Sequence, residues 1–86
     1  MTADEIETRL RAALAPQRLQ VQDDSHLHVG HAGAREGRHF TVHIASARFA
    51  GLSRVARHRL VYDSLGPLGA QGVHALAILA ELPPAD

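Results

Sequence analysis

The sequence contains no cysteine, no lysine and no tryptophan, and it has only two Phe and one Tyr. Without cysteine, the chain has neither a disulfide framework nor a thiolate metal site, so imidazole or carboxylate would have to bind any metal. Its core must be mainly aliphatic. No apolar run approaches the roughly 20 residues of a membrane span, and the start MTADEIETRLR is too acidic for a signal peptide. We therefore expect a soluble cytoplasmic protein.

The length and charge of the chain limit its organisation and its partners. With 86 residues, the chain should form a single domain over residues 1–86, and a domain of this size buries only about 60% of its unfolded surface. Nine basic residues, all of them Arg, balance nine acidic ones. Because non-specific nucleic-acid binders are usually net positive, this balance argues against such a role, although it permits a local basic patch.

Hydrophobic periodicity and turn residues predict the order of the elements. Apolar residues four apart predict helices, and alternation predicts strands. The elements are a helix over 2–15, strands over 17–23 and 38–45, a turn or short helix over 46–53, a helix over 54–65 and a strand over 73–82. The fold class is therefore α+β with the order α-β-β-α-α-β. We expect a three-stranded mixed sheet with helices on one face.

Two of these elements carry expectations about burial. Residues 73–82, VHALAILAEL, are apolar on both faces, so we expect this strand to be the most buried one. In the helix over 54–65, Val61 and Leu65 continue an apolar face that Val55 supports. The basic residues of its first two turns fall on the other side of the helix: Arg54, Arg57 and His58.

Histidine is abundant, with seven residues, and imidazole binds zinc, iron, copper and nickel. Residues 24–37 form a loop of a length that is usually functional or mobile. This loop contains three histidines: His26, His28 and His31. Residues i and i+2 of an extended chain point to one side, so the first two can chelate together. His74 stands at the start of the last strand, where a rigid scaffold presents it to solvent, whereas His39 is interpreted as structural.

Other interpretations of these patterns are open at the level of sequence. The spacing HxHxxH resembles the start of a hydrolytic zinc site, but Gly30 stands where such a site has an acidic residue. The same segment is also explained as a solvated polar loop. The GxxG strings at 30–33 and 66–69 lack the flanking helices and the basic character of a KH loop that binds nucleic acid.

Six short motifs resemble the BolA family, and together they cover roughly residues 19–79. In chain order they are Asp24-Ser25, Gly30-His31, His39-Phe40, Phe49-x-Gly51, Arg57-His58-Arg59-Leu60-Val61-Tyr62 and His74-Ala75-Leu76. The resemblance implies the family's α-β-β-α-α-β fold, which is related to type II KH domains. This fold agrees with the order of elements that the periodicity predicts.

The resemblance also implies a partner and a non-enzymatic function. BolA-like proteins pair with monothiol glutaredoxins and share a glutathione-containing 2Fe-2S cluster in iron–sulfur trafficking and iron regulation. The family's histidine near the C-terminal strand corresponds to His74. Its second ligand, a Cys or His of the loop, corresponds best to His31, with His28 and His26 as alternatives. We expect a monomer that holds no cluster alone and forms a heterodimer with glutaredoxin.

Transcriptional regulation is the alternative function, because some BolA-like proteins are described as DNA-binding regulators. The partner or nucleic-acid surface of this chain would consist of Arg54, Arg57, His58 and Arg59. The neutral charge and the absence of lysine make DNA binding the second choice. We expect these residues to form a docking surface beside the metal-binding histidines.

Overall fold

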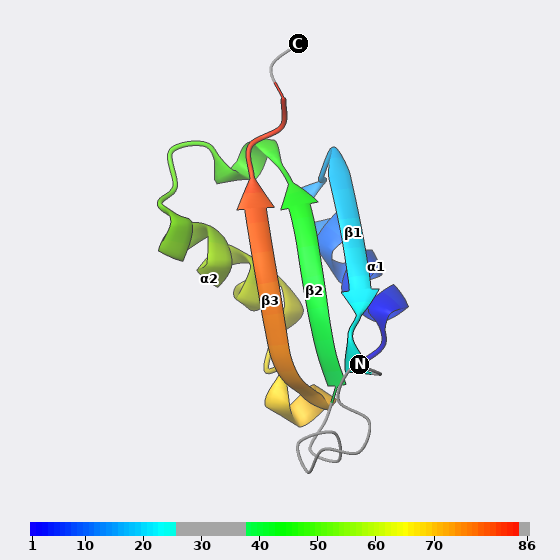
Figure 1. Cartoon of the computed structure of the whole chain (residues 1–86). Helices are drawn as coiled ribbons and strands as arrows, with labels where there is room; N and C mark the ends of the chain where they lie inside the picture. Colours follow the sequence, from blue (N-terminus) through cyan, green and yellow to red (C-terminus); the bar gives the residue numbers. More distant parts are fainter. Residues whose placement is uncertain (26–37, 85–86) are drawn as a thin grey trace.

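The computed structural model describes residues 1–25 and 38–84 and shows a three-stranded sheet with two helices behind it (Figure 1). Its elements are α1 (Ala3–Leu14), β1 (Arg18–Asp23), β2 (Arg38–Ala45), the 3-10 helix η3 (Ala47–Phe49), α2 (Arg54–Leu65), the 3-10 helix η4 (Gly69–Gln71) and β3 (Val73–Glu81). The predicted α+β class and the predicted order of elements are confirmed. From His26 to Gly37, the predicted loop lies outside the described residues.

Local sequence signals set the ends of both helices. Thr2 caps α1, since its side chain accepts a hydrogen bond from the Glu5 N–H at 3.2 Å. The helix ends at Ala15, which has φ 43°, directly before Pro16. Ser53 caps α2 by accepting from the Ala56 N–H at 3.1 Å, and Gly66 ends α2 with φ 81°.

The sheet has the strand order β1-β2-β3, so β2 lies in the middle. β1 pairs with β2 antiparallel, and β2 pairs with β3 parallel. The parallel pairing requires the chain to cross from the end of β2 to the start of β3, and α2 provides this crossover. Both helices lie on the same face of the sheet, and none of the described residues forms a layer on the other, open face (Figure 1).

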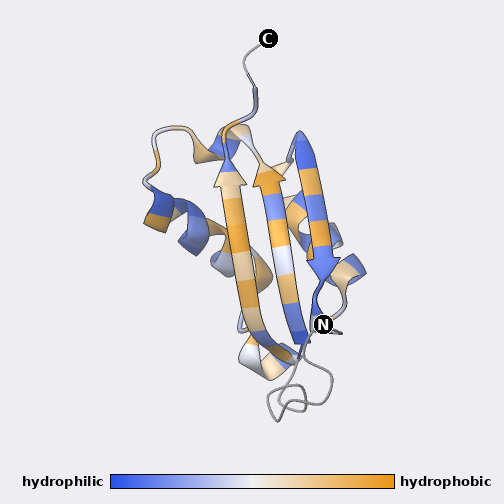
Figure 2. Cartoon of the chain, viewed as in Figure 1, coloured by the Kyte–Doolittle hydropathy of each residue, from blue (hydrophilic) through white to orange (hydrophobic). Residues whose placement is uncertain are grey.

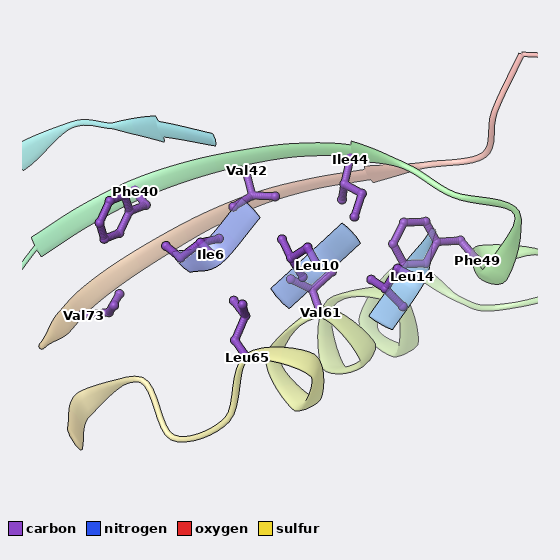
Figure 3. Close-up of a cluster of buried hydrophobic side chains, with 10 residues drawn as sticks. All are labelled: Ile6, Leu10, Leu14, Phe40, Val42, Ile44, Phe49, Val61, Leu65 and Val73. Atoms are coloured by element: carbon purple, nitrogen blue, oxygen red, sulfur yellow. The ribbon is translucent and has the colours of Figure 1, made fainter. Parts of the chain in front are cut away.

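The core lies between the sheet and the two helices (Figure 3). Its fully or almost fully buried apolar side chains are Ile6, Leu10 and Leu14 of α1, Phe40, Val42 and Ile44 of β2, Phe49 of η3, Val61 and Leu65 of α2, and Val73 of β3. These side chains are mostly aliphatic, as the composition predicts. The apolar face predicted for α2 at Val61 and Leu65 is confirmed.

The prediction that the last strand is the most buried was wrong. β3 lies at an edge of the sheet, and Val73 is its only residue classed as buried. Its residues are nevertheless mostly hydrophobic, as their colouring in Figure 2 shows. β2 is the buried strand, because it has a neighbour on each side and helices beneath it. Hydropathy does not report whether a strand is central or at an edge, and alanines tolerate an exposed position.

The prediction that Val55 supports the apolar face of α2 was also wrong, because its side chain is 60% exposed. It lies in the first turn of the helix, which projects beyond β3 (Figure 1).

Within residues 1–25 and 38–84, no helix has the length and hydropathy of a membrane span.

Candidate functional site at one end of the sheet

One end of each strand lies at the lower end of the sheet in Figure 1. β1 ends there with Asp23, and β2 and β3 begin there with Arg38 and Val73. This follows from the topology, because β1 runs antiparallel to β2 and β3 runs parallel to it. The two described ends that residues 26–37 connect, Ser25 and Arg38, therefore lie at this end of the sheet, and Arg38 is opposite Val73 at the start of β3.

Asp23 holds one of these two chain ends in a tight turn. Its carboxylate accepts a hydrogen bond from the Ser25 N–H at 2.9 Å, the pattern of an Asx turn. The guanidinium of Arg38 lies 3.2 Å from the other carboxylate oxygen. Hydrogen bonds from Ser25 are the main reason why the pKa of Asp23 is lowered, and the charge of Arg38 adds to the effect. The two chain ends are thus held together by an ionised carboxylate.

Asp24 and Ser25 hold the start of β2 against the end of β1. The His39 N–H donates to the Ser25 Oγ at 3.1 Å, and the His39 carbonyl accepts from the Asp24 N–H at 2.8 Å. The hydroxyl of Thr41 donates to the Asp24 carboxylate. His39 is therefore fixed through its backbone. This network gives a structural reason for Asp24-Ser25, which the sequence analysis identified only as a motif.

His74 lies in a β-bulge at the start of β3. Arg38 is opposite Val73, but the next residue of β2, His39, is opposite Ala75, so His74 is the extra residue. Gly72 precedes the strand with φ 81° and ψ 18°, a conformation that favours glycine. A bulge changes the direction of a side chain, and His74 is exposed. The predicted exposure of His74 at a strand start is confirmed.

The structure brings His39 and His74 together. Their ring centroids are 5.0 Å apart, and the planes are tilted by 52°. From sequence, His39 is interpreted as structural, without a connection to His74. The missed signal is the parallel pairing of the second and third strands, which brings the starts of both strands to the same end of the sheet.

The remaining predicted ligands, His26, His28 and His31, lie outside the described residues. Among the residues that are described, no group of three or more His, Asp or Glu is placed to hold a metal ion. The described part of the chain therefore offers a pair of imidazoles, His39 and His74, rather than a complete set of ligands.

Among the basic residues of α2, Arg57 lies at the other end of β3 from His74, so it does not lie beside that histidine as predicted. The Arg57 guanidinium donates to the carbonyls of Leu52 at 3.1 Å and Ala80 at 3.3 Å. Ala80 is six residues after His74, which is roughly 20 Å along a strand. Arg57 fastens α2 to the far end of β3. Of the other predicted surface residues, His58 is half-buried, and Arg54 and Arg59 are exposed.

The comparisons with known proteins agree on one family. A family model described as BolA-like protein matches residues 10–84. An uncharacterized protein in the cobS 5' region of Sinorhizobium is 47% identical over 76 residues, covering 85% of this chain and 82% of that protein. The DNA-binding transcriptional regulator BolA of Vibrio cholerae is 44% identical over 78 residues, covering 91% of this chain and 72% of that protein.

Other relatives are longer than this chain. It spans 23% of SufE-like protein 1 and 53% of BOLA1, both of Arabidopsis thaliana, at 43% and 39% identity over 91% and 94% of this chain. The first is described as chloroplastic/mitochondrial and the second as chloroplastic, so the cytoplasmic location stays a prediction for this chain.

Solved structures of these two proteins show the same fold. BolA1 from Arabidopsis thaliana has a TM-score of 0.82 at 39% identity, covering 96% of this chain and 93% of that one. The BolA domain of SufE1 has a TM-score of 0.81 at 43% identity, covering 94% of this chain and 91% of that one.

Proposed function

The chain belongs to the BolA-like family, and we propose that it shares a glutathione-containing 2Fe-2S cluster with a monothiol glutaredoxin, in iron–sulfur trafficking or iron regulation. The family indicates a regulatory or partner protein rather than an enzyme. One relative is a SufE-like protein and another is a transcriptional regulator by name.

The observation that supports this proposal is the position of His74. The residue is exposed in a β-bulge, and its ring lies 5.0 Å from that of His39. The ends of the described segments, Ser25 and Arg38, lie at the same end of the sheet, and residues 26–37 between them contain three further histidines. The described pair and the three histidines of residues 26–37 are the imidazoles available to the proposed cluster.

The available donors fit a shared cluster better than one held by this chain alone. A 2Fe-2S cluster is usually held by four thiolates, and imidazoles can replace two of them on one iron. This chain has no cysteine, so it supplies imidazole only. The glutaredoxin and glutathione would supply the thiolates, and the cluster is the cargo that the two proteins hold between them. His74 is the proposed first ligand of this chain.

The second ligand is proposed to come from the loop. His31 is the first choice, and His28 and His26 are the alternatives. His39 is half-buried and fixed through its backbone by Asp24 and Ser25. We assign to it the role of positioning the ring of His74.

The proposal is tested by reconstitution with a monothiol glutaredoxin, glutathione, iron and sulfide under anaerobic conditions. We expect a heterodimer whose visible circular dichroism spectrum differs from that of the glutaredoxin alone, and we expect His74→Ala to abolish this difference. His43→Ala is the matched control, because His43 lies on the same open face but pairs with Glu81 at 3.3 Å. His26, His28 and His31 are then changed singly. If the spectrum of His74→Ala equals that of the unchanged protein, His74 is not a ligand.

DNA binding is the second candidate, favoured by the name of the Vibrio cholerae relative. The exposed guanidiniums of Arg54 and Arg59 are the groups available to phosphates, since Arg57 is engaged with two carbonyls. Such binding would fall steeply with salt. It would also fall in Arg59→Ala but not in Arg18→Ala, which removes an exposed arginine from the opposite edge of the sheet. Absence of binding at low salt contradicts this function.

A further inference from the structure

β3 has an outer edge that no other strand covers within the described residues, because it pairs only with β2. Natural edge strands are usually short or protected by charge, proline or a bulge. Beyond its initial bulge, β3 continues as ALAILAE, without a charged residue before Glu81 and without proline. The opposite edge strand, β1, is shorter, and its sequence RLQVQD alternates polar with apolar residues. The two edges of this sheet therefore differ in their protection.

Two side chains of α2 cover the outer edge in part. The Tyr62 hydroxyl reaches the Leu76 carbonyl at 3.4 Å, and Arg57 reaches the Ala80 carbonyl at 3.3 Å. Both distances are long for hydrogen bonds. Because backbone groups alternate along a strand, Ile78 directs its N–H and C=O to the same edge. No side chain of the described residues bonds to these two groups of Ile78, which leaves the middle of the edge available.

The exposed large hydrophobic side chains of the described residues all lie beside this edge. They are Val55 and Tyr62 of α2, Leu79 of β3 and Leu82 after it, at 60%, 41%, 48% and 46% exposure. Val55 and Tyr62 are seven residues apart and so share one flank of the helix, and Tyr62 shows that this flank borders β3. Exposed apolar surface that is concentrated in one place marks an interaction site.

The charge beside the edge is positive. α2 contains three arginines and one acidic residue, Asp63. Neither Arg54 nor Arg59 has a carboxylate of the described residues within ion-pair distance, whereas Arg11 and Arg38 each have one. Arg59 stands four residues after Val55 and therefore lies on the same flank of α2. A segment along the edge would meet this guanidinium on its helix side and the apolar side chains of Ala77 and Leu79 on its open side.

We infer that the outer edge of β3, together with the Val55–Tyr62 flank of α2, binds an extended acidic segment of a partner protein as a fourth strand of the sheet. Main-chain hydrogen bonds to Leu76, Ile78 and Ala80 provide affinity, and alternate side chains provide specificity. Acidic side chains face Arg59, and apolar ones continue the open face of the sheet. The surface is separate from the proposed cluster ligands and needs no metal.

The charge of α2 also selects this occupant over a second copy of the chain. Symmetric pairing of two β3 edges would bring two α2 helices side by side on the same face. Their exposed arginines would then repel each other. An acidic segment without a helix of its own brings no second helix to this face, and its carboxylates attract the arginines of α2.

The test uses the full chain, without metal, and an eight-residue peptide that alternates glutamate with valine and has both ends blocked. Saturable binding is followed by NMR. We expect shifts at the amides of Leu76, Ile78 and Ala80 and slower amide exchange at Ile78. Arg59→Glu should weaken binding by up to about fivefold, since an exposed ion pair contributes up to about 1 kcal/mol. Arg18→Glu is the control, because it makes the same charge change at the opposite edge of the sheet.

Two N-methylated peptides separate strand addition from charge attraction alone. One carries methyl groups on the glutamate amides and the other on the valine amides, so each blocks one edge of the added strand. We expect one of the two to lose binding, and its identity gives the direction of the added strand. Equal binding of both N-methylated peptides, an equal effect of Arg59→Glu and Arg18→Glu, unchanged exchange at Ile78, or no saturable binding of the unmethylated peptide would each overturn the inference.

Discussion

The rings of His39 and His74 lie 5.0 Å apart, although 35 positions separate the two residues along the chain. His39 belongs to β2, and His74 occupies the bulge of the parallel neighbour β3. The bulge places His74 on the exposed side of the strand, while backbone bonds to Asp24 and Ser25 fix its neighbour. This pair connects the fold to the proposed function, because only the parallel pairing brings the two imidazoles together.

Replacing the positioning residue should change the lifetime of the shared cluster rather than its formation. We expect His39→Ala to form the cluster-containing heterodimer with glutaredoxin but to release the cluster faster, because the ring of His74 is then less restricted. The decay of the visible absorption under oxygen measures this effect. His43→Ala, on the same face of β2, should decay like the unchanged protein. A lifetime in His39→Ala equal to that of the control would show that the ring of His39 has no such role.

Gly72 should be required for the position of His74. At φ 81° and ψ 18°, an alanine is strained by about 1 kcal/mol, so Gly72→Ala should lower the free energy of unfolding by about that amount. Urea denaturation measures it. Gly69→Ala is the control, because Gly69 has no positive φ and an added Cβ there meets nothing within 4 Å. Equal stabilities of the two variants would contradict the argument.

Asp23 should make stability depend on pH in the acid range. Its pKa is lower in the folded state than in the unfolded chain, so its stabilising contribution is fully present above the unfolded pKa and is lost as the pH falls through the folded pKa. Asp23→Asn should therefore be less stable than the unchanged protein at neutral pH, and the difference should shrink under acid conditions. Because over a third of the side chain is exposed, the effect should be small. A difference that stays constant with pH would exclude the carboxylate as its cause.

Arg57 should act as a structural residue and not as a surface ligand. Its guanidinium donates to the Leu52 carbonyl before α2 at 3.1 Å and, over a longer 3.3 Å, to the Ala80 carbonyl of β3. A hydrogen bond that involves a charged group contributes about 1.5–3 kcal/mol. Arg57→Ala should lower the free energy of unfolding by about 2 kcal/mol, whereas Arg54→Ala, at an exposed position, should change it by less than about 0.5 kcal/mol. Thermal or urea unfolding distinguishes the two. Similar stabilities of Arg57→Ala and Arg54→Ala would contradict the structural role and leave Arg57 as a candidate residue of the docking surface.

The features that sequence predicts well here are local. Thr2 and Pro16 give the ends of α1, and alternation gives β2 over Arg38–Ala45 as observed. Burial of Phe40, Val42 and Ile44 follows from the same alternation. These signals act within a few residues of one another, so they do not depend on contacts between distant elements.

What sequence could not predict depends on contacts between distant elements. The edge position of β3 depends on the strand order, and the apolar composition of the strand indicated the opposite. The role of Arg57 depends on the position of the Ala80 carbonyl, 23 residues later. The bulge at His74 appears only in the register against β2. His74 itself could be chosen from the sequence, but its neighbour His39 could not.

The most direct test of the central claim asks whether a nitrogen atom of His74 binds the cluster. The chain is labelled with ¹⁵N-histidine, reconstituted with unlabelled glutaredoxin and glutathione, and reduced, and pulsed electron paramagnetic resonance then records nuclei coupled to the cluster. We expect a ¹⁵N coupling of directly bound imidazole that is retained in His43→Ala and is lost in part or in full in His74→Ala. An identical coupling in His74→Ala, or no ¹⁵N coupling in the unchanged protein, would contradict it.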